Sequence, residues 1–168
     1  MNAADEELLR QLSSELERRL PPDVHDDYEL LVPAMRRLPL GLRAMAATHR
    51  LDVSMAVDDL GWHFHNFHHR AFCDETQWGL RELEAAEAAD IFESARWLVE
   101  PHWDEIASLK AIGGEAFAEW YKDSGLEREL APLNRRLWAI CERSASYGLM
   151  QYWLVYARKY PEKVSQAR

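Results

Sequence analysis

A histidine-rich stretch, GWHFHNFHHRAFC from Gly61 to Cys73, contains the side chains of this chain that are best suited to metal chemistry. If the stretch is one helix, a step of about 100° per residue places His65, His69 and Cys73 on one face, each a turn apart. Histidines four residues apart on a helix can chelate a transition metal, and imidazole together with thiolate suits zinc. The spacing therefore raises a candidate metal site at these three residues.

The same helical projection also predicts a core face on the other side of the stretch. Its members fall within about 80° of arc and are all apolar: they are Val57, Leu60, Phe64, Phe67 and Ala71. We expect Val57, Leu60, Phe64 and Phe67 to be buried.

The number of available ligands favours a structural role for the histidines. A structural zinc site has about four ligands, whereas this helix supplies two or three in a line, and His102 and Asp104 would complete a site only if folding brought them close. Trp62 and the imidazoles would instead pack against another element. We interpret the stretch as structural and without bound metal, with a metal site or a catalytic histidine as alternatives.

No other segment carries a recognisable catalytic motif. The chain contains no GxSxG, phosphate loop, HExxH or dinucleotide-binding glycine pattern. Cys141, in LWAICERS, lies on an apolar helix and reads as a small core residue. We therefore expect a protein that is not an enzyme and has no cofactor.

The elements that position these residues are predicted to be helices throughout. Leucines at three- and four-residue spacing mark a first helix, which Pro21 and Pro22 end. Asp74 is a predicted N-cap for a helix that runs towards Pro101, and Gly113 and Gly125 end two later helices. No segment alternates with the two-residue period of a strand. We expect an all-α fold of seven to nine helices in a single compact domain over residues 1–168, with N-terminal helices in residues 1–38.

Charge and composition narrow the function classes. No apolar run approaches the roughly 18 residues that span a bilayer, and the first twenty residues lack the features of a signal peptide. Two well-separated cysteines suit a reducing cytoplasm. A net charge of −9 argues against direct nucleic-acid binding. Residues 74–129 contain 15 acidic and 5 basic side chains, so the excess lies in the middle third.

Three groups of residues resemble a known family, the DMP-type bacterial DNA-mimic proteins. DLGWHFHNF (59–67) stands where that family has an Asn-Gly-Gly-aromatic turn and an aromatic run. A helix pattern follows at Leu80, Leu83, Ala85, Ala89, Ile91 and Ala95, and a C-terminal pattern at Tyr156, Arg158 and Pro161. The resemblance covers roughly residues 40–163. Asp59 and Leu60 replace the usual Asn and Gly, and Glu84 replaces a helix glycine.

The resemblance implies a helical, acidic, non-enzymatic protein that presents carboxylates in place of DNA phosphates to a basic DNA-binding regulator. It leaves the oligomeric state open, with a homodimer as one option. Two alternatives remain: an immunity-type protein that neutralises a cationic toxin, and a metal-binding protein or enzyme built on the histidine cluster.

One acidic patch is the predicted partner-binding site. If a helix restarts near Ala86, its inward face consists of Ala88, Ile91, Phe92, Ala95 and Leu98. Asp90, Glu93, Trp97 and Glu100 then lie together on the outward side. The carboxylates would steer a basic partner, and the tryptophan would supply contact area. The alternative is that a neighbouring helix covers Trp97.

Overall fold

The computed structural model describes residues 3–20, 22–25, 27–143 and 147–165, and in these ranges every regular element is helical. The expected all-α fold is confirmed. The α-helices are α1 (Ala3–Arg19), α2 (Tyr28–Arg36), α3 (Leu40–Val57), α4 (Leu60–Asn66), α5 (Arg70–Glu82), α6 (Ala86–Val99), α7 (Trp103–Ile112), α8 (Gly114–Asp123), α9 (Leu126–Glu142), α10 (Met150–Lys159) and α11 (Pro161–Ser165). Two 3-10 turns, η1 (Pro22–Val24) and η2 (Glu100–His102), connect α1 to α2 and α6 to α7.

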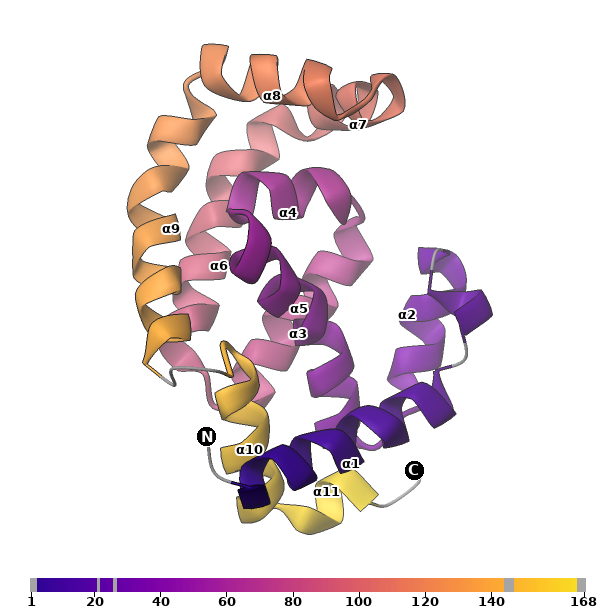
Figure 1. Ribbon diagram of the computed structural model, residues 1–168. Helices are drawn as coiled ribbons and strands as arrows, with labels where there is room; N and C mark the ends of the chain where they lie inside the picture. The colour runs from indigo at the N-terminus through magenta and orange to yellow at the C-terminus, as the bar shows by residue number, and fades with distance from the viewer. Residues whose placement is uncertain (1–2, 21, 26, 144–146, 166–168) are drawn as a thin grey trace.

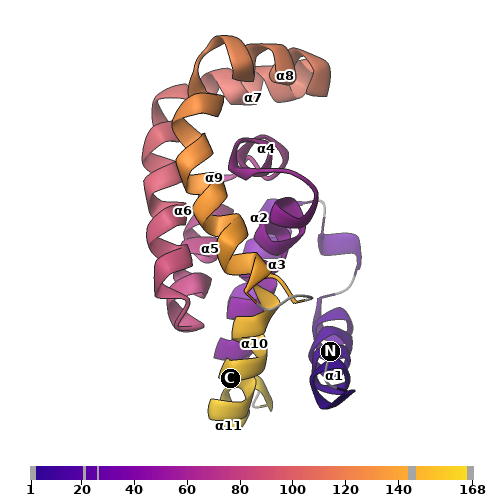
Figure 2. The same cartoon turned by 60° about the vertical axis from the view of Figure 1, so that its left-hand side comes forward.

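The helices have a simple arrangement around α3. In Figures 1 and 2, α6 and α9 run side by side along one flank, and α7 and α8 cross one end of the molecule. Helices α1 and α11 lie at the opposite end. No helix in the described ranges is long and apolar enough to cross a bilayer.

Two groups of buried side chains hold these helices together, and α3 contributes to both. Leu51 of α3 packs with the group that contains Phe64 and Phe92, whereas Met45 packs with the group that contains Trp153. Contact between α3 and α5 is close, because a Cβ atom at Gly79 would lie 2.9 Å from the Ala44 carbonyl oxygen. Only glycine fits there without separating the helices.

The histidine-rich stretch is not one helix, which corrects the prediction. The chain leaves α3 at Val57, and the Asp59 side chain caps α4 by accepting a hydrogen bond from the Trp62 amide at 3.0 Å. A second break separates α4 from α5, where the His69 Nδ1 atom accepts from the Phe72 amide at 3.3 Å. Both breaks rest on side-chain caps and contain no glycine or proline, so the helical period of apolar residues runs through them without interruption.

The breaks change which residues are buried. Leu60 and Phe64 are fully buried as expected, but the prediction for Val57 is wrong, since its side chain is 77% exposed at the end of α3. Phe67 is only partly buried in the turn before α5. Asp74 is not an N-cap either, because α5 has already begun at Arg70.

The helix restart near Ala86 is confirmed. Helix α5 ends at Glu82, and Glu84 adopts a left-handed φ of 60° in the turn before α6. A non-glycine residue in that conformation ends the regular hydrogen bonding of a helix. The structure consequently divides the described residues into more helices than the seven to nine expected.

Candidate partner-binding surface

Helix α6 has the buried face and the exposed face that the sequence predicts. Ala88, Ile91, Phe92 and Ala95 are fully buried, and Leu98 is partly buried. On the other side, Asp90, Glu93, Trp97 and Glu100 are all exposed. Helix α6 and the first residue of η2 thus place the four predicted site residues on the protein surface.

Trp97 is uncovered, which decides between the two alternatives for this residue. Its side chain is 74% exposed, so no neighbouring helix in the described chain packs over it. Beside it lies a depression of about 270 Å³ that Gln77, Glu93, Arg96 and Glu100 line with Trp97. An exposed indole next to a hollow is a common feature of protein-binding surfaces.

Arginines from neighbouring helices bind the predicted carboxylates. Arg81 of α5 donates to Asp90 at 2.9 Å and to Glu93 at 3.0 Å. Arg70, at the start of α5, forms an ion pair with Glu100. The acidic patch (Asp90, Glu93, Trp97 and Glu100) therefore presents much less net negative charge than its sequence suggests, because each carboxylate shares its charge with a guanidinium.

Carboxylates without such partners lie at the end formed by α7 and α8. Glu115, Glu119 and Asp123 occupy every fourth position of α8, and all three are exposed. Four helical residues rise about 6 Å, so the three lie in a row within about 80° of arc. No ion pair or hydrogen bond to these side chains is found within the described residues. We call Glu115, Glu119 and Asp123 the α8 row.

The surroundings of the α8 row are also acidic. Exposed carboxylates flank it on α7 and at the start of α9: Asp104, Glu105, Glu127 and Glu129. Three basic residues, Lys110, Lys122 and Arg128, lie in the same helices before Leu130. This end therefore holds seven acidic and three basic side chains, a net charge of −4. The spacing of the α8 row is visible in the sequence, but the arginine partners of the other carboxylates are not.

The buried face of α8 fixes the row to the rest of the protein. Phe117 is fully buried and stacks on the His65 ring, with 4.2 Å between ring centroids. Tyr121 stacks on Phe117 and donates its hydroxyl hydrogen to Asp59 Oδ2 at 3.1 Å. Asp59 also caps α4, so one carboxylate connects α8 to α4. The row is thus held on a supported helix.

The histidines of α4 and the following turn contribute to that support. His68 stacks on Trp103 of α7 at 3.9 Å between centroids. His63 is fully buried, and its Nδ1 atom lies 2.9 Å from Ser54 Oγ. Burial lowers the pKa of all three of His63, His65 and His68, that of His63 to about 3. These rings are therefore neutral aromatic packing elements at neutral pH.

The alternative metal site required His65, His69 and Cys73 to lie on one face of a single helix, and the structure does not place them so. His65 of α4 packs against Phe117 of α8. His69 instead caps α5 and stacks on Tyr28 at 4.9 Å between ring centroids. Cys73 is fully buried, and burial raises its pKa to about 12, which disfavours the thiolate that a metal needs. Within the described residues, no three His, Cys, Asp or Glu side chains are grouped closely enough to hold a metal ion.

Comparison with known proteins gives one match. No curated protein and no solved structure shows significant similarity to the chain. A family model described as DMP19-like protein matches residues 36–159, which is most of the chain and nearly the region of the predicted resemblance. The chain belongs to the DMP19-like protein family.

Proposed function

We propose that this protein is a non-catalytic binding protein that acts as a DNA mimic: its carboxylates occupy the DNA-binding surface of a basic protein. Two independent features support the proposal. The chain belongs to the DMP19-like family, which it was found to resemble by its motifs. Its net charge is −9, and the acidic excess is concentrated in one part of the chain.

The α8 row is the observation that carries the proposal. Successive phosphates of one DNA strand are separated by a rise of about 3.4 Å along the axis and by a rotation about it, so they lie about 6–7 Å apart. The row presents carboxylates at a rise of about 6 Å on a rigid helix. A Lys or Arg array built for successive phosphates of one strand would therefore meet charges at nearly its own spacing. Because these carboxylates have no cationic partner among the described residues, none has to be displaced on binding.

The acidic patch on α6 is the alternative surface for the same function. Binding there would have to compete with Arg81 and Arg70 for the carboxylates, which reduces the gain from a basic partner. In its favour, Trp97 offers a large exposed aromatic surface. Charge reversal distinguishes the two surfaces, because it is expected to abolish partner binding only at the surface that the partner contacts.

The test is capture of the partner from a lysate of the native host at low salt, with three triple variants. Glu115→Lys/Glu119→Lys/Asp123→Lys reverses the α8 row, and Asp90→Lys/Glu93→Lys/Glu100→Lys reverses the patch. A matched control, Glu6→Lys/Glu142→Lys/Glu162→Lys, changes the net charge equally at exposed positions on α1, α9 and α11. We expect the first variant to abolish capture and the control to retain it.

Other outcomes would redirect or end the proposal. Loss of capture with the patch variant alone would place the site on α6 around Trp97. Equal loss with all three variants would show that net charge, and no particular surface, governs binding. The captured protein also decides the class: a DNA-binding regulator released by competing duplex DNA supports mimicry, whereas a cationic toxin supports the immunity alternative. An unchanged fold, checked by circular dichroism, is required of each variant.

A further inference from the structure

A pocket of about 350 Å³ lies between α1, α2, α3 and α10, at a distance along the fold from the α7–α8 end. Its apolar lining comes from Leu16, Leu20, Leu31, Met35 and Trp153, and the last four of these are almost completely buried. The volume falls within the range of roughly 300–1,000 Å³ that is typical of small-molecule sites. The pocket is thus large enough to bury the apolar part of a small ligand.

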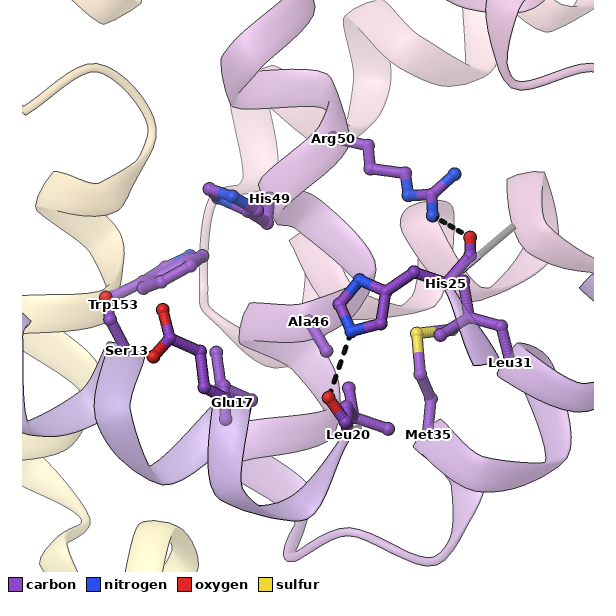
Figure 3. A pocket seen from close by; sticks show the side chains of 11 residues that line it. Ser13, Glu17, Leu20, His25, Leu31, Met35, Ala46, His49, Arg50 and Trp153 are labelled. Carbon is purple, nitrogen blue, oxygen red and sulfur yellow. Dashed lines mark hydrogen bonds between the residues drawn. The ribbon is translucent and has the colours of Figure 1, made fainter. Parts of the chain in front are cut away.

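Polar groups occupy opposite sides of this pocket (Figure 3). Glu17 and Ser13 lie with the Trp153 ring on one side, and His25 and Arg50 lie on the other. Arg50 is already engaged, since its guanidinium donates to the Tyr28 hydroxyl at 2.8 Å and to the His25 carbonyl oxygen.

Glu17 differs from its neighbours on α1. Glu15 accepts hydrogen bonds from Arg18 and Arg19, but no ion pair or hydrogen bond to the Glu17 carboxylate is found within the described residues. An unpaired negative charge at the edge of an apolar, aromatic-lined cavity favours a cationic group on the ligand. The indole N–H of Trp153 is bound to Thr48 Oγ1 at 3.1 Å, so the ring offers no free hydrogen-bond donor to the pocket.

We propose that this pocket binds a small organic amine, with its ammonium group paired with Glu17 and its apolar body against the partly exposed side chains of Leu16 and Ala46. The Ser13 hydroxyl oxygen is a second acceptor for the ammonium group. Arg50, on the other side, repels a cation and so orients the ligand. His49 tilts against Trp153 with 5.8 Å between centroids and closes the pocket next to that ring.

Most of the residues that line this pocket lie outside the region that matches the family model. Seven of the eleven residues that line the pocket precede residue 36, where the family match begins. The segment before the family region therefore builds one wall of the pocket, and α3 and α10 provide the other. The proposed ligand site is separate from the α8 row, and it stands or falls independently of the proposed function.

Calorimetric titration at neutral pH with three matched probes tests the proposal: 2-phenylethylamine, neutral 2-phenylethanol and anionic 3-phenylpropionate. We expect the amine to bind most tightly and Glu17→Gln to weaken it about tenfold, as expected for losing one charge-assisted hydrogen bond. Glu17→Gln should leave the alcohol unaffected. Glu6→Gln, an exposed change on the same helix, should leave amine binding unchanged, and Ala46→Phe should fill the pocket and abolish it.

Three results would overturn the proposal. The first is no binding of the amine at millimolar concentration. The second is amine binding that Glu17→Gln does not weaken, or that Glu6→Gln weakens equally. The third is a preference for 3-phenylpropionate, which would assign the charge recognition to Arg50. Because Glu17 is exposed, Glu17→Gln is expected to fold normally, so the test does not depend on Ala46→Phe being stable.

Discussion

Burial of His63 makes the stability of this protein depend on pH in a predictable way. The ring is fully buried among Phe64, Phe67 and Phe92, and burial lowers its pKa from 6.5 to about 3. In the unfolded chain the imidazole takes up a proton below about pH 6.5. The folded protein resists protonation until about pH 3. The unfolded state therefore binds more protons between these limits, and the free energy of unfolding falls as the pH is lowered through this window.

The size of the effect follows from the two pKa values. Each pH unit inside the window costs about 1.4 kcal/mol per histidine, so His63 alone removes about 2 kcal/mol of stability by about pH 5. His65 and His68, whose pKa values burial also lowers, act in the same direction.

The perturbation that isolates His63 is His63→Phe. The substitution keeps an aromatic ring of similar size, and Ser54 Oγ retains its hydrogen bond to the Arg50 carbonyl oxygen at 2.9 Å. Urea unfolding at about pH 7.5 and about pH 5 should show that the variant loses about 2 kcal/mol less on acidification than the unmodified protein. All other titrating groups are common to both proteins and cancel in this difference.

Phe92→Leu serves as the control, since it removes buried volume next to His63 without removing a titrating group. It should lower stability by the same amount at both pH values. If His63→Phe and the unmodified protein lose equal stability on acidification, the buried neutral histidine is not the cause and the reasoning fails.

Three further predictions concern packing, cysteine reactivity and binding. Gly79→Ala should destabilise the protein by about 1–3 kcal/mol in urea unfolding, because its Cβ would meet the Ala44 carbonyl oxygen at 2.9 Å; a variant of unchanged stability would show that α3 and α5 are not in such close contact. In a Cys141→Ser background, Cys73 should react with a disulfide reagent only after denaturation, since burial raises its pKa to about 12, and rapid labelling of the native protein would contradict this. Partner capture should fall steeply between 0.1 M and 1 M salt, where the screening length shrinks from about 10 Å to about 3 Å; capture that is insensitive to salt would argue against recognition by the α8 row.

The faces of individual helices could be predicted from the sequence alone. In α6, apolar residues at three- and four-residue spacing place Ile91, Phe92 and Ala95 inside and Asp90 and Glu93 outside, as the structure shows. This succeeds because helical periodicity is a local property, and a stripe of apolar side chains must be buried whatever covers it. The all-α class follows from the same periodicity.

The ends of helices are harder to predict from the sequence where a capping side chain, and not glycine or proline, terminates the helix. Asp59 and His69 cap α4 and α5, and the apolar period continues across both positions, although aspartate is a common N-cap residue. A histidine is an uncommon N-cap, and this one also stacks on Tyr28 of α2. The single face of His65, His69 and Cys73 was therefore predicted from a helix that the fold does not form.

Tertiary structure alone decided which charges are available to a partner and where a ligand can enter. Arg81 and Arg70 reach the carboxylates of α6 only because α5 packs beside that helix, whereas the α8 row crosses an end where no described cation reaches it. The pocket similarly brings Glu17 within one cavity with Trp153, more than a hundred residues away. Such long-range contacts have no local periodicity, so the sequence determined the helices and their faces, and the packing of those helices determined the electrostatics and the cavity.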